Sequence, residues 1–125
     1  MLTYYTGVYK VENSKELKEL IKYFTKQFGN EGDLNWIDTT DIIDMSHLFD
    51  NSKFNGDISK WNVSNVTNMA HMFSWCKNFN GNISNWDVSN VTNMEGMFET
   101  CAFNGDISKW DVSNVTNMYW LFFSS

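Results

Sequence analysis

The stretch FNGNISNWDVSNVTNMEGMFETC, residues 79–101, is the unit from which most of this chain is built. Close copies occupy residues 54–76 and 103–125, and a degenerate copy, DLNWIDTTDIIDMSHLF, occupies residues 33–49. One tryptophan in each copy marks a period of 24 or 25 residues; these are Trp36, Trp61, Trp86 and Trp110. A repeat of this length is typical of solenoid proteins, in which each unit buries its apolar face only by stacking on its neighbours.

Each copy contains two apolar patterns and one turn signal. Residues 66–76, VTNMAHMFSWC, place apolar side chains at helical spacing and predict a short helix. Residues 57–61, DISKW, predict a short strand, and the Asn-Gly pair before them predicts a turn. We therefore expect an α/β repeat over residues 33–125, with one short parallel strand and one short helix in each of about four coils.

Residues 1–32 do not follow the repeat and predict a cap for the first coil. Residues 2–11, LTYYTGVYKV, are rich in β-branched and aromatic side chains and predict strand. Asn13 or Ser14 is then placed to cap a helix that ends at Gly29, and with Asn13 as the cap, Glu16 takes the capping-box position. The apolar stripe of this helix consists of Leu17, Leu20, Ile21, Phe24 and Phe28.

The formal charge of -6 is unevenly distributed along the chain. Residues 1–28 carry five lysines and three glutamates, whereas the remainder carries four lysines and twelve acidic residues. The chain contains no arginine. Because an acidic repeat region repels phosphate, nucleic acid is not an expected partner.

The repeats resemble the BspA-like leucine-rich repeat, a unit of about 25 residues also described as the mycoplasma-type surface repeat of unknown function. Its signature reads F-x-x-D-I-S-x-W-D-V-S-N-V-T-N-M-x-x-M-F-x-x-C. Residues 79–101 match it nearly letter for letter, and residues 54–76 and 103–122 match it with few departures. The resemblance implies a short leucine-rich-repeat solenoid of the kind found in bacterial surface proteins, some of them adhesins. It therefore implies a non-enzymatic binding module for a protein or glycan partner.

The resemblance also implies display at the cell surface or secretion. However, the N-terminus MLTYYTGVYKVENSKELKEL lacks a basic region followed by an apolar one, so no signal peptide is expected. No lipid anchor is visible, and no apolar run is long enough to insert across a membrane. A cytoplasmic location is the alternative. With it comes an alternative function, an intracellular structural or assembly protein that associates through the solenoid ends.

An acidic, polar stripe along the predicted strand face is the first candidate binding surface. Its residues are Asp57, Ser59, Asn82, Ser84, Asp106 and Ser108. The carboxylates and amides of this stripe have an alternative role, which is to accept backbone N–H bonds at turns.

The C-terminal end is the second candidate surface. The last copy ends in MYWLFFSS, residues 118–125, and adds Tyr119, Trp120 and Phe123 to the apolar positions of the repeat. Because a large exposed apolar patch usually marks an interaction site, these aromatics predict a homodimer through this end.

No set of residues in the chain predicts catalysis, a cofactor or a metal site. Cys76 and Cys101 share one column of the repeat, where equivalent side chains point the same way, so we expect two small buried hydrophobes rather than a disulfide. His47 and His71 share another column, which continues as glycine and then tryptophan. That column predicts a variable surface rather than a metal site.

Overall fold

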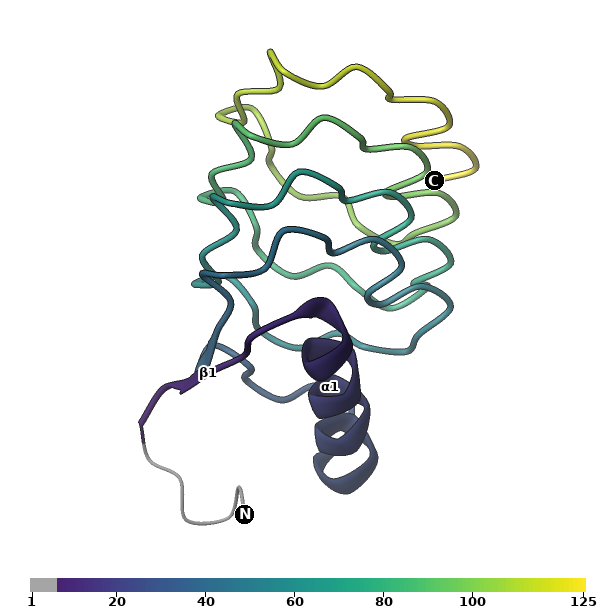
Figure 1. Cartoon of the computed structure of the whole chain (residues 1–125). Helices are drawn as coiled ribbons and strands as arrows, with labels where there is room; N and C mark the ends of the chain where they lie inside the picture. Colours follow the sequence, from purple (N-terminus) through teal and green to yellow (C-terminus); the bar gives the residue numbers. More distant parts are fainter. Residues whose placement is uncertain (1–6) are drawn as a thin grey trace.

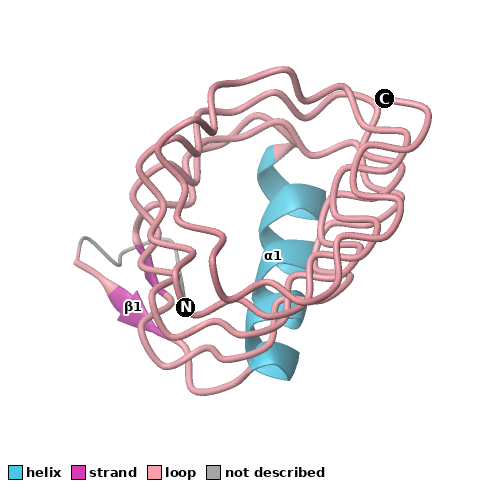
Figure 2. Cartoon of the chain, turned by 90° about the horizontal axis from the view of Figure 1, so that it is seen from above, coloured by secondary structure: helices cyan, strands magenta, loops and turns pink. Residues whose placement is uncertain are grey.

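A computed structural model describes residues 7–125 of the chain. The chain begins with β1 (Tyr9–Lys10), continues through α1 (Ser14–Phe28) and β2 (Ile37–Asp38), and then winds upward in stacked coils (Figure 1). Seen from above, the coils lie over one another around a common interior, and α1 crosses the end of that stack (Figure 2). β1 falls within the segment predicted as strand, whose first residues, 2–6, lie outside the described part.

The bounds of α1 agree with the sequence prediction. The side chain of Asn13 accepts a hydrogen bond from the backbone N–H of Glu16 at 2.9 Å, and Gly29 ends the helix with φ of 88°. Leu17 and Ile21 are buried against the first coil, which α1 covers. The assignment of Phe28 to the buried stripe was wrong, because this side chain is 60% exposed.

A two-stranded parallel sheet attaches the N-terminal segment to the first repeat. Tyr9 of β1 pairs with Ile37 of β2. The backbone N–H of Tyr9 donates to the carbonyl of Trp36 at 2.9 Å, and that of Val11 donates to the carbonyl of Asp38 at 3.2 Å. The N-terminal segment is therefore joined to the stack by backbone hydrogen bonds as well as by the buried side of α1.

Backbone hydrogen bonds join neighbouring coils along the segments that were predicted to be helical. The N–H groups of alternate residues donate to carbonyls one repeat later, as from Met45 to Asn68 at 2.9 Å and from Met69 to Asn93 at 2.9 Å. Isolated parallel bridges join Asp44, Asn68, Asn93 and Asn117 in one row. The inter-coil pairing therefore runs through this part of the repeat.

These segments form turns rather than helices, and α1 is the only helix among residues 7–125. In the second repeat, Met72 N–H donates to Met69 O and Ser74 N–H donates to His71 O, each closing a turn over three residues. His71 and Trp75 have φ of 56° and 61°, in the left-handed region. An α-helix cannot continue through such residues, so the apolar spacing produces successive turns with the same inward face.

The segments predicted as strands also differ from the prediction. Residues 59–60 form a turn, and Asp57 makes a single isolated bridge to Asp33. The reason lies in the side chain of Asp57, whose Oδ1 accepts the backbone N–H of Ser59 at 2.9 Å. Asn62 and Asn68 accept in the same way from the residues two positions later. Such side-chain bonds compete with an extended strand and turn the chain at three places in each coil.

The core is a set of side-chain columns that run through the stack. The rings of Phe49, Phe73 and Phe98 stack with centroid separations of 5.5 and 5.8 Å. Trp61 and Trp86 are each 4% exposed, and Trp110 is partly buried. Each of these tryptophans donates its Nε1–H to a carbonyl of the preceding coil at 2.9 to 3.1 Å. The tryptophan column thus joins the coils by both packing and hydrogen bonding.

Candidate functional site

The predicted polar stripe lies at one of the three turns of each coil. Asp57, Asn82 and Asp106 are exposed, and the Oδ1 of each accepts the backbone N–H of the serine two residues later. These serines are Ser59, Ser84 and Ser108. The hydrogen bond from the Ser59 backbone holds the pKa of Asp57 below its usual value, and the Ser108 hydroxyl does the same for the pKa of Asp106. The Asp and Asn side chains of the stripe therefore stabilise turns by accepting backbone N–H bonds, which was their alternative role.

Acid should weaken this fold through the same turns. The pKa values of five aspartates are lowered by hydrogen bonds from a serine or threonine two residues later; these are Asp38, Asp57, Asp87, Asp106 and Asp111. A carboxylate with a lower pKa in the folded state adds stability above its unfolded pKa and loses it as pH falls through the folded one. We expect the melting temperature to fall below about pH 4, measured by circular dichroism.

A variant with all five aspartates changed to asparagine is the matched control. Asn62 and Asn82 already occupy the same columns and accept the same backbone bonds, so this variant should fold. Its melting temperature should depend less on pH below about pH 4 than that of the wild type. An identical acid dependence in the two proteins would show that these turns are not the titrating elements.

A different surface carries most of the variation among the repeats, and we call it the turn face. It comprises four positions in each turn segment that lie outside the apolar core. By coil, they are Ser46, His47, Asp50 and Asn51; Ala70, His71, Ser74 and Trp75; Glu95, Gly96, Glu99 and Thr100; and Tyr119, Trp120, Phe123 and Ser124. Within the last three coils, no residue type recurs at any of the four positions.

The rest of the repeat is nearly invariant in the last three copies. Residues 54–69, 79–94 and 103–118 differ only in three columns, two of which exchange Asp with Asn and one of which exchanges Lys with Asn. The Asp/Asn exchanges keep the acceptor atoms of the turns. The sequence prediction placed candidate binding residues on the stripe and on the last coil, and it did not single out the turn face as one surface. The available signal was this contrast between the varied columns and the repeated ones.

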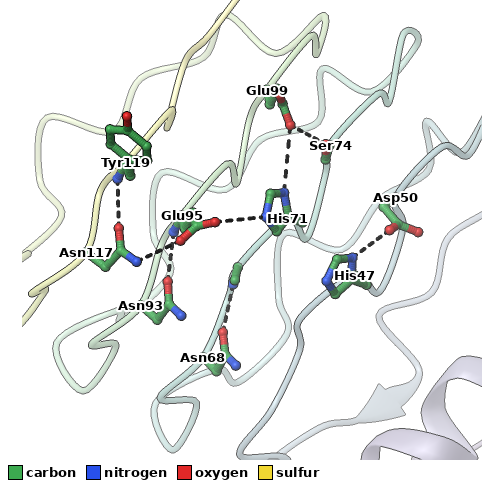
Figure 3. Close-up of polar contacts among 11 residues, drawn as sticks. His47, Asp50, Asn68, His71, Ser74, Asn93, Glu95, Glu99, Asn117 and Tyr119 are labelled. Carbon is green, nitrogen blue, oxygen red and sulfur yellow. Dashed lines mark hydrogen bonds and ion pairs between the residues drawn. The ribbon is translucent and has the colours of Figure 1, made fainter.

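A cluster of two histidines and three carboxylates occupies the first three coils of the turn face (Figure 3). The rings of His47 and His71 stack with centroids 5.0 Å apart and an angle of 19°. The Nδ1 of His47 lies 2.7 Å from Asp50 Oδ2. His71 lies between two carboxylates of the next coil, with its Nε2 3.5 Å from Glu95 Oε2 and its Nδ1 3.8 Å from Glu99 Oε1.

The glycine of the third coil makes room for this arrangement. Gly96 has φ of 59°, and a Cβ at this position would lie 2.4 Å from the imidazole ring of His71. Glu95 is held in turn by Asn117, whose Nδ2 donates to Glu95 Oε1 at 2.8 Å. Among residues 7–125, no group of three or more His, Cys, Asp or Glu side chains is placed to hold a metal ion. The cluster is instead a network in which the histidines, the carboxylates and Asn117 contact one another.

The two cysteines lie in the core behind the turn face. Both thiols are free and buried, as their shared column predicted, and Cys76 Sγ donates to the carbonyl of Phe49 at 2.7 Å. Burial raises the pKa of Cys76 to about 12, and it also raises the pKa of Cys101.

Cys76 should therefore resist thiol reagents in the folded protein. Because the thiolate is the reactive form, its raised pKa should slow reaction with Ellman's reagent near pH 8 about a thousandfold relative to an exposed cysteine. Absorbance of the released thiol measures the rate, and the same protein unfolded in urea provides the reference rate. Rapid reaction of Cys76 in the native state, identified with a Cys101→Ser variant, would contradict its position in the core.

The predicted association residues lie on the last coil. Tyr119, Trp120 and Phe123 are 65%, 50% and 55% exposed. Their rings contact one another, with centroids 5.3 Å apart for Tyr119 and Trp120 and 5.5 Å apart for Trp120 and Phe123. Met118 and Phe122 are also exposed at this end, so the last coil carries a continuous apolar surface.

Comparison with known proteins identifies one family. Residues 15–125 match the family described as "Mycoplasma protein of unknown function, DUF285". No curated protein matches the chain. No solved structure matches it either. Within residues 7–125, no helix is long and apolar enough to cross a membrane.

Proposed function

We propose that this chain, which belongs to the Mycoplasma protein family of unknown function DUF285, is a non-enzymatic binding module that recognises a protein or glycan through its turn face. One observation carries the proposal. In the last three coils, the core columns and the Asp and Asn acceptors of the turns are nearly unchanged, whereas the side chains of the turn face differ from coil to coil.

The proposal includes a finer assignment of the fold and family, a leucine-rich-repeat solenoid of the BspA-like type. The signature matched by residues 79–101 supports it, as does the stacking of coils with a period of 24 or 25 residues. Solenoids offer an extended surface on which side chains stand at fixed spacing, which suits macromolecular ligands. A surface or secreted location belongs to the same proposal, with the cytoplasm as its alternative.

The chain itself supplies matched variants to test this function. Changing Glu95→Ala and Glu99→Ser places the residues of the second coil on the turn face of the third. Changing Asn82→Asp and Asn85→Lys makes the same exchange at a turn outside this face. Wild type and both variants, fluorescently labelled, would be applied to an array of purified glycans and extracellular-matrix proteins.

Wild type should bind at least one array component. The Glu95/Glu99 exchange should weaken that binding about tenfold, and the Asn82/Asn85 exchange should leave it unchanged. Equal binding by all three proteins would overturn the assignment to the turn face. Binding by none would overturn the proposal of an extracellular binding module.

Association through the last coil is a second candidate function, in keeping with a structural or assembly protein. The exposed aromatics of this coil favour it. In earlier coils the N–H groups equivalent to those of Met118, Trp120 and Phe122 donate to the following coil, whereas these three make no backbone bond within the described chain. Two copies in which these segments face each other would place donors against donors. A homodimer of that kind would therefore depend on side-chain packing.

Light scattering tests this candidate. Wild type at tens of micromolar should have the mass of a dimer, and the variant Trp120→Glu/Phe123→Glu should be a monomer, because charges on the apolar surface prevent its burial. A circular dichroism melt of the variant would confirm that it folds. A monomeric wild type would exclude this association.

A further inference from the structure

A surface pocket beside the turn face contains an aromatic ring and two lysines. Its volume is about 490 Å³, and it is lined by Asn51, Ser52, Lys53, Trp75, Lys77 and Asn78. These residues come from the first and second coils, more than twenty residues apart in sequence, and meet because the coils are paired. The backbone N–H of Asn51 donates to the carbonyl of Ser74 at 2.7 Å, which fixes the two sides of the pocket.

Trp75 is not required by the stack. It is 49% exposed, and its column is otherwise filled by the small polar residues Asn51, Thr100 and Ser124. Its backbone has φ of 61°, a conformation that costs a bulky side chain free energy and that asparagine tolerates. All four residues of this column have positive φ, so this backbone conformation belongs to the repeat, and only the large ring is peculiar to the second coil.

The two lysines bring positive charge to an acidic part of the chain. Lys53 and Lys77 are two of only four lysines after residue 28, and they occupy the same column of adjacent coils. Lys77 Nζ lies 5.5 Å from the centroid of the Trp75 ring. Neither lysine forms an ion pair within residues 7–125.

The carboxylates next to the pocket are already engaged. Asp50 Oδ2 contacts the imidazole of His47, and Glu99 Oε1 accepts from Ser74 Oγ at 3.1 Å. In the second repeat, two residues, Lys77 and Asn78, lie between Cys76 and Phe79. In the first and third repeats, only one residue lies between the equivalent positions. The extra residue lengthens the rim of the pocket and adds an amide to it.

We infer that this pocket binds a saccharide that carries a single carboxylate or sulfate group. The inference rests on the proposed binding function and names its ligand. The electron-rich face of an indole attracts the C–H groups on the apolar face of a sugar ring. The two ammonium groups match one anionic substituent, and the amides of Asn51 and Asn78 both donate and accept, as sugar hydroxyls require. Longer polyanions are disfavoured, because the surrounding repeats are acidic.

The intact chain would be titrated with sialyllactose, which carries one carboxylate, with lactose 3′-sulfate, which carries one sulfate, and with neutral lactose. The indole N–H signal of Trp75 in ¹H–¹⁵N spectra reports occupancy, and it is assigned by its loss in Trp75→Asn. We expect a dissociation constant of about 1 mM or below for a charged sugar, and binding about tenfold weaker for lactose. Added salt should weaken the charged ligand and not the neutral one. The two charged sugars separate a carboxylate ligand from a sulfate ligand.

Two variants copy residues from the same columns of other coils. Trp75→Asn introduces the residue type that the first coil has at Asn51, and Lys77→Ala introduces the one that the third coil has at Ala102. Each should weaken binding about tenfold or more. Lys60→Asn is the control, because Lys60 is exposed, lies outside both the pocket and the turn face, and has Asn85 in its column. It should bind like wild type.

Three outcomes would overturn the inference. The first is no shift of the Trp75 signal with either charged sugar. The second is unchanged affinity in Trp75→Asn. The third is tighter binding of oligothymidylate or of a glutamate-rich peptide than of either sugar, which would assign the pocket to another class of ligand. The Glu95/Glu99 exchange on the array tests the proposed function separately, so that function can hold when this pocket fails.

Discussion

Replacement of Trp86 by alanine should lower the free energy of unfolding by about 3–5 kcal/mol, the range for removal of a large aromatic side chain from a core. Trp86 is 4% exposed, and its Nε1–H donates to the carbonyl of Ile58 in the preceding coil at 3.1 Å. The change removes packing and one inter-coil hydrogen bond together. Because stacked repeats are stabilised by their interfaces with neighbours, the transition should also become less cooperative. Urea denaturation followed by circular dichroism measures both effects.

Two further variants separate the contributions. Trp86→Phe keeps an aromatic ring but leaves the carbonyl of Ile58 without this donor, which should cost about 1–3 kcal/mol. Trp75→Ala removes a tryptophan that is 49% exposed and should change stability by no more than about 0.5 kcal/mol. A denaturation curve for Trp86→Ala that overlays wild type would show that the tryptophan column does not hold the coils together.

Replacement of Gly56 by alanine should cost about 2–3 kcal/mol, because it forces two coils apart. A Cβ at this position would lie 2.1 Å from the backbone oxygen of Gly32 and 2.7 Å from the ring of Phe54. The same oxygen of Gly32 accepts the N–H of Asp57 at 3.0 Å, so the contact cannot relax without loss of an inter-coil bond.

The equivalent glycines provide a graded series. At Gly81, a Cβ would lie 3.2 Å from the backbone oxygen of Gly56, and at Gly105 its three nearest neighbours are all atoms of the Phe103 side chain. The cost of alanine should therefore fall in the order Gly56, Gly81, Gly105, measured by urea denaturation. Equal costs at all three positions would show that close approach of the backbones does not decide the need for glycine here.

The cap and the identity of the core residues followed from local patterns in the sequence. Asn13, one of the two predicted caps, and Gly29 bound α1, because capping depends on the residues next to the helix end. The repeat period and the burial of Trp61, Trp86 and both cysteines also followed, since a column that repeats unchanged can pack against itself. Phe28 was predicted on the apolar stripe but is exposed. It lies at the end of α1, and only the first turns of this helix pack against the stack.

The sequence by itself determined which side chains point inward, but only the tertiary structure decided the backbone between them. Spacing of three and four residues suits a helix and a run of turns equally, and hydrogen bonds from each coil to the next select the turns. Asn-Gly predicted a turn at residues 55–56, whereas Gly56 is needed because the carbonyl of Gly32 approaches it. The pocket of Lys53 and Trp75 likewise exists only once the coils are in register, because no local signal relates residues in different repeats.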